Sequence, residues 1–88
     1  MLNDRMLGST NAQWSQIECG IAYTAALTKK GEVFTWGFNF VGQLGHGDKE
    51  HRDVPTKVAA LEGLVITQVS CGRDHTAVLT DTGDLFMW

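Results

Sequence analysis

The 88-residue sequence has little proline, cysteine or positive charge, and each shortage excludes a class of protein. One proline and two cysteines, Cys19 and Cys71, do not make a disulfide-stapled secreted domain, and we expect a reduced intracellular protein of the cytoplasm or nucleus. Lysine and arginine number 7 against 10 aspartate and glutamate residues, which argues against direct binding of nucleic acid. The apolar runs, such as residues 58–61, are far shorter than the ~20 residues that span a bilayer, so no membrane span is expected.

The remaining composition is that of a small folded domain. Hydrophobic residues make up 43% and charged residues 19%, which is ordinary for a globular chain and rules out a disordered one. Residues 1–13 contain no apolar block and therefore do not form a signal peptide. Ten glycines indicate many tight turns, and hence short strands rather than long helices.

The sequence repeats itself at an offset of 52 residues. Residues 14–36 (WSQIECGIAYTAALTKKGEVFTW) align without a gap to residues 66–88 (ITQVSCGRDHTAVLTDTGDLFMW), and ten of the 23 positions are identical. A period near 50 residues is too long for paired helices and fits one four-stranded blade of a β-propeller. The identical pairs include Cys19/Cys71, Gly20/Gly72, Thr24/Thr76, Leu27/Leu79, Gly31/Gly83 and Trp36/Trp88.

The local patterns predict an all-β chain that forms a partial β-propeller of about one and a half four-stranded antiparallel blades. Short β-compatible runs alternate with glycine-containing turns, in which Gly31 and Gly83 supply a positive φ. The only helical candidate is one or two turns within residues 58–63. Leu79 is expected to be buried on its strand. The predicted strands are 14–18, 23–28, 32–36, 66–70, 77–80 and 84–87, with an outer strand at 54–59 after Pro55.

The repeat also sets the expected domain boundaries. Residues 1–13 match the repeat poorly, residues 14–36 are the end of one repeat, and residues 37–88 are one full repeat. Trp88 ends the sequence where its counterpart Trp36 is followed by Gly37, so we expect a fragment of a longer protein, truncated at the C-terminus. An incomplete ring exposes sheet edges and apolar blade faces, and the isolated fragment is therefore expected to self-associate.

The segment between the two copies contains the most specific motif. Residues 36–48 (WGFNFVGQLGHGD), followed by a proline and then by V-x-C-G-x-x-H-T-x-x-L-T-x-x-G-x-L-F-x-W, resemble the repeat of the regulator of chromosome condensation family. The resemblance covers residues 14–88 and implies a seven-bladed β-propeller. Leu44 is expected to plug the turn, Trp36 and Trp88 to anchor the packing, and both cysteines to be buried as small apolar groups. The motif residues assigned a structural role are Trp36, Gly37, Asn39, Gly42, Gln43, Leu44, Gly45, Gly47, Cys19, Gly20, Cys71, Gly72, Thr76, Gly83 and Trp88.

Several kinds of chemical site are not expected. The glycines of residues 42–47 are not followed by a helix or by Gly-Lys-Ser/Thr, so they do not predict nucleotide binding. The histidines and cysteines lack metal-ligand spacing, and we expect neither a metal nor a cofactor. No nucleophile, base and acid occur in a recognisable motif, so the chain is not expected to be an enzyme, although a full-length parent could be an exchange factor or contain a ubiquitin-ligase or kinase domain.

One loop is a candidate for binding a partner. Arg73, Asp74 and His75 replace Ile-Ala-Tyr of the first copy within the same Cys-Gly-x-x-x-Thr frame, and loop positions that vary between repeats often form the binding surface. The resemblance implies that acidic and histidine residues in such loops help to displace nucleotide from a small GTPase. The alternative is structural: His75 hydrogen-bonds the turn, and Arg73 and Asp74 are neutral surface residues.

The sequence therefore predicts a protein–protein interaction or regulatory module, with guanine-nucleotide exchange on a small GTPase as the alternative. The expected partner is a protein. Ultraviolet photoreception, which some relatives perform through clustered tryptophans in this loop, is not expected because residues 72–76 contain no tryptophan.

Overall fold

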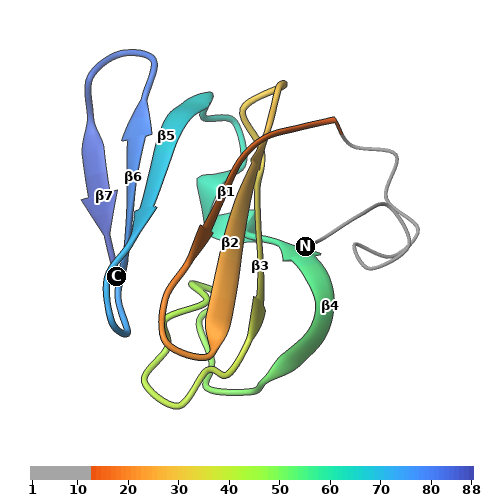
Figure 1. The fold of residues 1–88 in the computed structure, drawn as a ribbon. Helices are drawn as coiled ribbons and strands as arrows, with labels where there is room; N and C mark the ends of the chain where they lie inside the picture. The colour runs from red at the N-terminus through yellow and green to blue at the C-terminus, as the bar shows by residue number, and fades with distance from the viewer. Residues whose placement is uncertain (1–12) are drawn as a thin grey trace.

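The computed structural model describes residues 13–88, which fold into two antiparallel β-sheets (Figure 1). The first sheet has the order β1-β2-β3-β4 and the second the order β5-β6-β7. The prediction of an all-β chain is confirmed, since the described residues contain only a single turn of 3-10 helix besides the strands. The elements are β1 (Trp14–Cys19), β2 (Tyr23–Thr28), β3 (Val33–Gly37), β4 (Arg52–Lys57), η1 (Ala59–Leu61), β5 (Ile66–Cys71), β6 (Thr76–Thr80) and β7 (Leu85–Met87).

Six of the seven predicted strands are confirmed to within one residue at each end. The outer strand is not: β4 begins at Arg52 and ends at Lys57, two residues before the predicted range at both ends. Arg52 pairs with Gly37 of β3, so the strand starts as soon as the preceding loop returns to the sheet. Pro55 then lies inside the strand and not at its start, which an edge strand tolerates because one side of its backbone forms no ladder. The predicted segment 1–13 lies outside the described residues apart from Gln13.

The sequence repeat is also a repeat of backbone structure. In the first sheet Trp14 pairs with Thr28, and a bulge follows before Gln16 pairs with Leu27. In the second sheet the residues 52 positions later pair in the same way, with the bulge at the same place. Gly31 and Gly83 occupy equivalent hairpin turns with φ of 87° and 89°, as predicted. The two copies therefore form successive blades with the same strand pairing and the same bulge.

Each sheet has two faces, which we call face A and face B. Residues that pair across strands share a face. In the first sheet, face A consists of the rows Gln16–Leu27–Val33, Glu18–Ala25–Thr35–Thr56 and Tyr23–Gly37–Arg52, and face B of the rows Trp14–Thr28, Ile17–Ala26–Phe34–Lys57 and Cys19–Thr24–Trp36. In the second sheet, face A consists of Gln68–Leu79–Leu85 and Ser70–Ala77–Met87, and face B contains Ile66–Thr80, Val69–Val78–Phe86, Cys71–Thr76 and Trp88.

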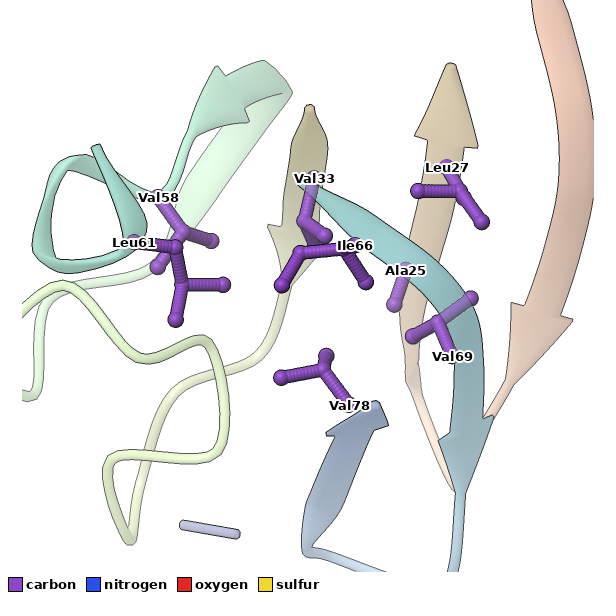
Figure 2. Close-up of a cluster of buried hydrophobic side chains, with 8 residues drawn as sticks. All are labelled: Ala25, Leu27, Val33, Val58, Leu61, Ile66, Val69 and Val78. Atoms are coloured by element: carbon purple, nitrogen blue, oxygen red, sulfur yellow. The ribbon is translucent and has the colours of Figure 1, made fainter. Parts of the chain in front are cut away.

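The core forms where face A of the first sheet packs on face B of the second. Figure 2 shows Ile66 and Val69 of β5 directed towards Leu27 and Ala25 of β2. Val58, Val33, Leu61 and Val78 complete this cluster, and Trp88 packs against its edge. Neither sheet buries its apolar face alone, so the two blades stabilise each other.

This arrangement corrects two expectations about burial. Cys71 lies on face B of the second sheet, inside the interface, and is half-buried, whereas Cys19 lies on face B of the first sheet and is exposed. Leu79 lies on face A of the second sheet and is only partly buried, whereas its counterpart Leu27 is buried. The sequence copies are equivalent, but their surroundings are not, because only one pair of sheet faces meets within residues 13–88.

Candidate partner-binding site

Three loops meet at one end of the two sheets, the lower end in Figure 1. They connect β1 to β2, β3 to β4, and β5 to β6. The amide of Ile21 donates to the carbonyl of Arg73 over 2.9 Å, and the amide of Phe38 donates to the carbonyl of Ala22 over 3.0 Å. Backbone hydrogen bonds thus join the first loop to both of the others, and the loops form one continuous surface.

In each of the two short loops, a glycine lies beneath an aromatic ring. The amide of Gly20 donates to the carbonyl of Tyr23 over 3.0 Å, and that of Gly72 donates to the carbonyl of His75 over 2.8 Å. A Cβ at either glycine would collide with the ring three residues later. The hydroxyl of Tyr23 also donates to the carbonyl of His75, and burial raises the pKa of this phenol well above its ordinary value of 10.0. A buried tyrosine therefore joins the two short loops.

The long β3–β4 loop is built around the buried side chain of Asn39. Its amide nitrogen lies 3.0 Å from the carbonyl oxygens of Asp48 and Glu50, and its amide oxygen accepts from the backbone N–H of Leu44 over 3.0 Å. Leu44 is fully buried beneath the loop. Gly42 and Gly45 have φ near 80°, which lets the chain turn tightly around both side chains. The motif therefore holds the loop in one conformation.

The anchored loop exposes aromatic side chains. Phe38 and Phe40 stack with their ring centroids 5.5 Å apart, and the ring of His51 meets Phe40 edge-on at 4.6 Å. Phe40 is 67% exposed, and Val41 and Ile21 are exposed to a similar degree. Apolar groups clustered in this way on a loop surface are typical of a binding site.

An open pocket of about 350 Å³ lies among these side chains. We call its lining the loop face. Two of the three predicted partner-binding residues, Arg73 and Asp74, lie on it and are exposed, so the structure brings them together with the aromatic cluster. The residues of the loop face are Ile21, Ala22, Phe38, Phe40, Val41, Gln43, Arg73 and Asp74.

The third predicted residue, His75, does not line the pocket. Its ring lies over Gly72, and the hydrogen bonds at this turn are accepted by its main-chain carbonyl. The residues predicted from the sequence did not include Phe38, Phe40 and Val41. Their signal was present: Phe-x-Phe-Val is an apolar run inside a glycine-rich loop and follows no strand pattern, so its side chains have no sheet face on which to be buried.

The charges next to the loop face are paired. The guanidinium of Arg52 contacts the carboxylate of Asp48 at 2.9 Å and holds the pKa of that carboxyl below its ordinary value. Arg73 and Asp74 take part in none of the ion pairs found among residues 13–88. They are therefore available to a partner that approaches the apolar cluster. Within residues 13–88, no three histidine, cysteine, aspartate or glutamate side chains are grouped closely enough to hold a metal ion, and no helix is long and apolar enough to cross a membrane.

Comparison with known proteins identifies the repeat. Two sequence profiles of the regulator of chromosome condensation (RCC1) repeat match residues 30–79 and 14–43. The ultraviolet-B receptor UVR8 of Arabidopsis thaliana is 49% identical over 73 residues, which is 83% of this chain and 17% of the receptor. The probable E3 ubiquitin-protein ligase HERC4 of Mus musculus is 54% identical over 59 residues, or 67% of this chain and 6% of the ligase.

Solved structures agree with these matches. The crystal structure of human WBSCR16 superposes with a TM-score of 0.83 and 34% identity, over 90% of this chain and 20% of that one. The structure of Prp20p from Saccharomyces cerevisiae, reported with its binding properties to Gsp1p and histones, superposes with a TM-score of 0.72 and 29% identity, over 85% of this chain and 18% of Prp20p. The chain thus spans a fifth or less of each of these relatives.

Proposed function

This chain belongs to the RCC1 repeat family, as its motif indicated, and we propose that it is a protein-interaction module whose loop face binds a protein partner. The observation that supports the proposal is the exposed aromatic cluster of Phe38 and Phe40 beside Arg73 and Asp74. Aromatic and arginine side chains dominate the binding energy of protein interfaces, and a nearby carboxylate adds charge selectivity.

Binding explains the composition of the loop face better than catalysis does. Its lining contains no serine, cysteine or histidine, so the pocket offers no nucleophile or general base beyond the exposed carboxylate of Asp74. The relatives named as ubiquitin ligases are many times longer than this chain, and their names describe the whole proteins. We propose that the chain itself acts by binding inside the cell, in the cytoplasm or nucleus.

Paired variants of exposed apolar residues test the proposal. Phe40→Asp places a charge in the loop face, and Val54→Asp places the same charge on β4, at a position that is also more than half exposed. Proteins captured from the source cells by the wild-type chain should be retained by Val54→Asp. Their recovery with Phe40→Asp should fall at least about tenfold, which corresponds to the loss of 1.4 kcal/mol of binding.

Equal recovery with both variants would refute the loop face as the binding site. Melting curves of the two variants, compared with the wild type, separate loss of binding from loss of folding. A captured partner is then titrated against Arg73→Glu, which should weaken binding if the charged rim contributes to it.

Guanine-nucleotide exchange remains the alternative for the same surface. The exposed carboxylate of Asp74 lies in the pocket, where it is free to compete with nucleotide phosphates for a bound magnesium ion. The test is the release of a fluorescent guanine nucleotide from a panel of small GTPases, with and without the chain. Acceleration that Asp74→Ala abolishes would establish exchange, and no acceleration of any GTPase would leave the interaction module alone.

A further inference from the structure

The repeat leaves one copy of each interface face exposed. Face A of the first sheet is covered by the second sheet, and there Leu27 is 3% and Val33 2% exposed. Their counterparts on face A of the second sheet are the partly buried Leu79 and Leu85, which is 64% exposed. The second sheet therefore presents, uncovered, the same kind of surface that the first sheet buries.

The opposite surface is exposed on the first sheet. Val69, on face B of the second sheet, is buried against the first sheet, whereas its counterpart Ile17 is 40% exposed. The rows of this exposed face B contain the half-buried rings of Trp14, Phe34 and Trp36. Their one charged residue is Lys57 of β4, which is already ion-paired with Glu32 and Glu62. The rows of the exposed face A of the second sheet contain no charged residue, so joining the two faces would leave no buried ion without a partner.

A hydrogen bond inside the chain shows how such faces join. The side-chain oxygen of Gln16 accepts from the backbone N–H of Val69 over 2.9 Å and links the first strands of the two blades. Fifty-two residues later, Gln68 stands at the same place on the exposed face A of the second sheet, and its side chain is exposed. Ile17, the counterpart of Val69, stands at the same place on the exposed face B of the first sheet.

We propose that face A of the second sheet binds face B of the first sheet of a second copy of this chain. In this contact the side chain of Gln68 accepts from the backbone N–H of Ile17 in the second copy, as Gln16 does from Val69 within one chain. Leu85 and Met87 become covered by the second copy. The contact joins two different faces, so every pair retains one free face of each kind and can add a further copy.

Aspartate substitutions on the two faces test the inference by sedimentation. The wild-type chain should gain mass as its concentration rises, and Leu85→Asp should remain at the 9.7 kDa of one chain. Burial of an unpaired carboxylate should weaken the contact more than about 100-fold. Phe40→Asp is the matched control: it changes an equally exposed apolar residue on the loop face and should self-associate like the wild type.

Mixing distinguishes the proposed contact from a symmetrical one. Leu85→Asp retains an intact face B on its first sheet, and Ile17→Asp retains an intact face A on its second sheet. Neither variant should therefore associate alone. A mixture of the two variants should form a dimer and nothing larger. Leu85→Asp in excess should also cap the wild-type chain at the mass of two copies, a result that does not depend on the folding of Ile17→Asp. The inference would be overturned if the wild-type chain stayed monomeric at all concentrations. It would also be overturned if Leu85→Asp still associated with itself and failed to limit the wild-type chain to dimers.

Discussion

Leu27 and Leu79 occupy the same position in two copies of one blade, which makes them a matched pair for testing how the blades are stabilised. Leu27 lies in the interface between the sheets and is 3% exposed. Leu79 lies on the outer face A and is only partly buried. Both are leucines at the same step of the same strand pairing, so their strand propensity and local backbone structure largely cancel in the comparison.

Leu27→Ala should destabilise the chain by about 3–5 kcal/mol, because it removes buried methyl groups and leaves a cavity among Val33, Ile66 and Val69. Leu79→Ala should cost about 1–2 kcal/mol, because its side chain is only partly removed from water and its loss leaves an open surface instead of a cavity. Since small domains are stabilised by only about 5–10 kcal/mol, the first change should leave the chain close to unfolding and the second should not.

Urea denaturation at low protein concentration measures both free energies of unfolding, since dilution removes any contribution from a second copy. Val33→Ala and Leu85→Ala form a second pair at equivalent positions, with a milder change in the core, in case Leu27→Ala does not fold. Losses of equal size within both pairs, or a larger loss at the outer positions, would refute the interpretation that only one pair of faces is buried.

Three further predictions concern single residues. Cys19 should react with an alkylating reagent several-fold faster than Cys71, because Cys19 is exposed and burial raises the pKa of the Cys71 thiol. Mass spectrometry of the partly alkylated chain measures the ratio of the two reaction rates. Gly20→Ala should cost about 1–3 kcal/mol and Gly72→Ala less, because the ring above Gly20 is buried and that above Gly72 is exposed and can rotate away; thermal unfolding compares them. Burial lowers the pKa of His46 below its ordinary value of 6.5. The part of the folding stability that depends on neutral His46 is therefore fully present above pH 6.5 and is lost as the pH falls through the folded-state pKa. Urea titrations at several pH values should show this loss, and His46→Gln should reduce it.

Six of the strands were predictable because each has a counterpart 52 residues away in the sequence, whereas β4, whose limits were predicted wrongly, has none. A strand such as Thr76–Thr80 has little signal alone, but its alignment with residues 24–28 and the shared turn glycines fix its limits. Burial was not predictable in the same way. Leu79 and Cys19 depend on whether another sheet covers their face, and this is a property of the assembly that equivalent sequence positions cannot reveal.

The site was predictable only in the part where the two copies differ. Comparing the copies drew attention to Arg73 and Asp74, because Ile21 and Ala22 stand in their places. It could not find Phe40, since that residue lies in the segment between the aligned copies and has no counterpart to be compared with. Only the fold shows that the long loop returns to the same end of the sheets as the short ones.

The positions that the repeat leaves free are the ones that form the loop face. Gly20 and Gly72 are identical because each lies beneath a ring, and Thr24 and Thr76 each pair with the cysteine that ends the first strand of the blade. The side chains of the two residues after each glycine are exposed and carry no such constraint, and the loop is held by backbone hydrogen bonds and by the left-handed conformation of Ala22 (φ 63°). A substitution there alters what the surface can bind at little cost to the fold, which is the condition under which one scaffold can acquire different partners. Exchanging Arg73 and Asp74 for the Ile-Ala of the first copy should therefore leave the melting temperature nearly unchanged while altering the binding of the captured partner.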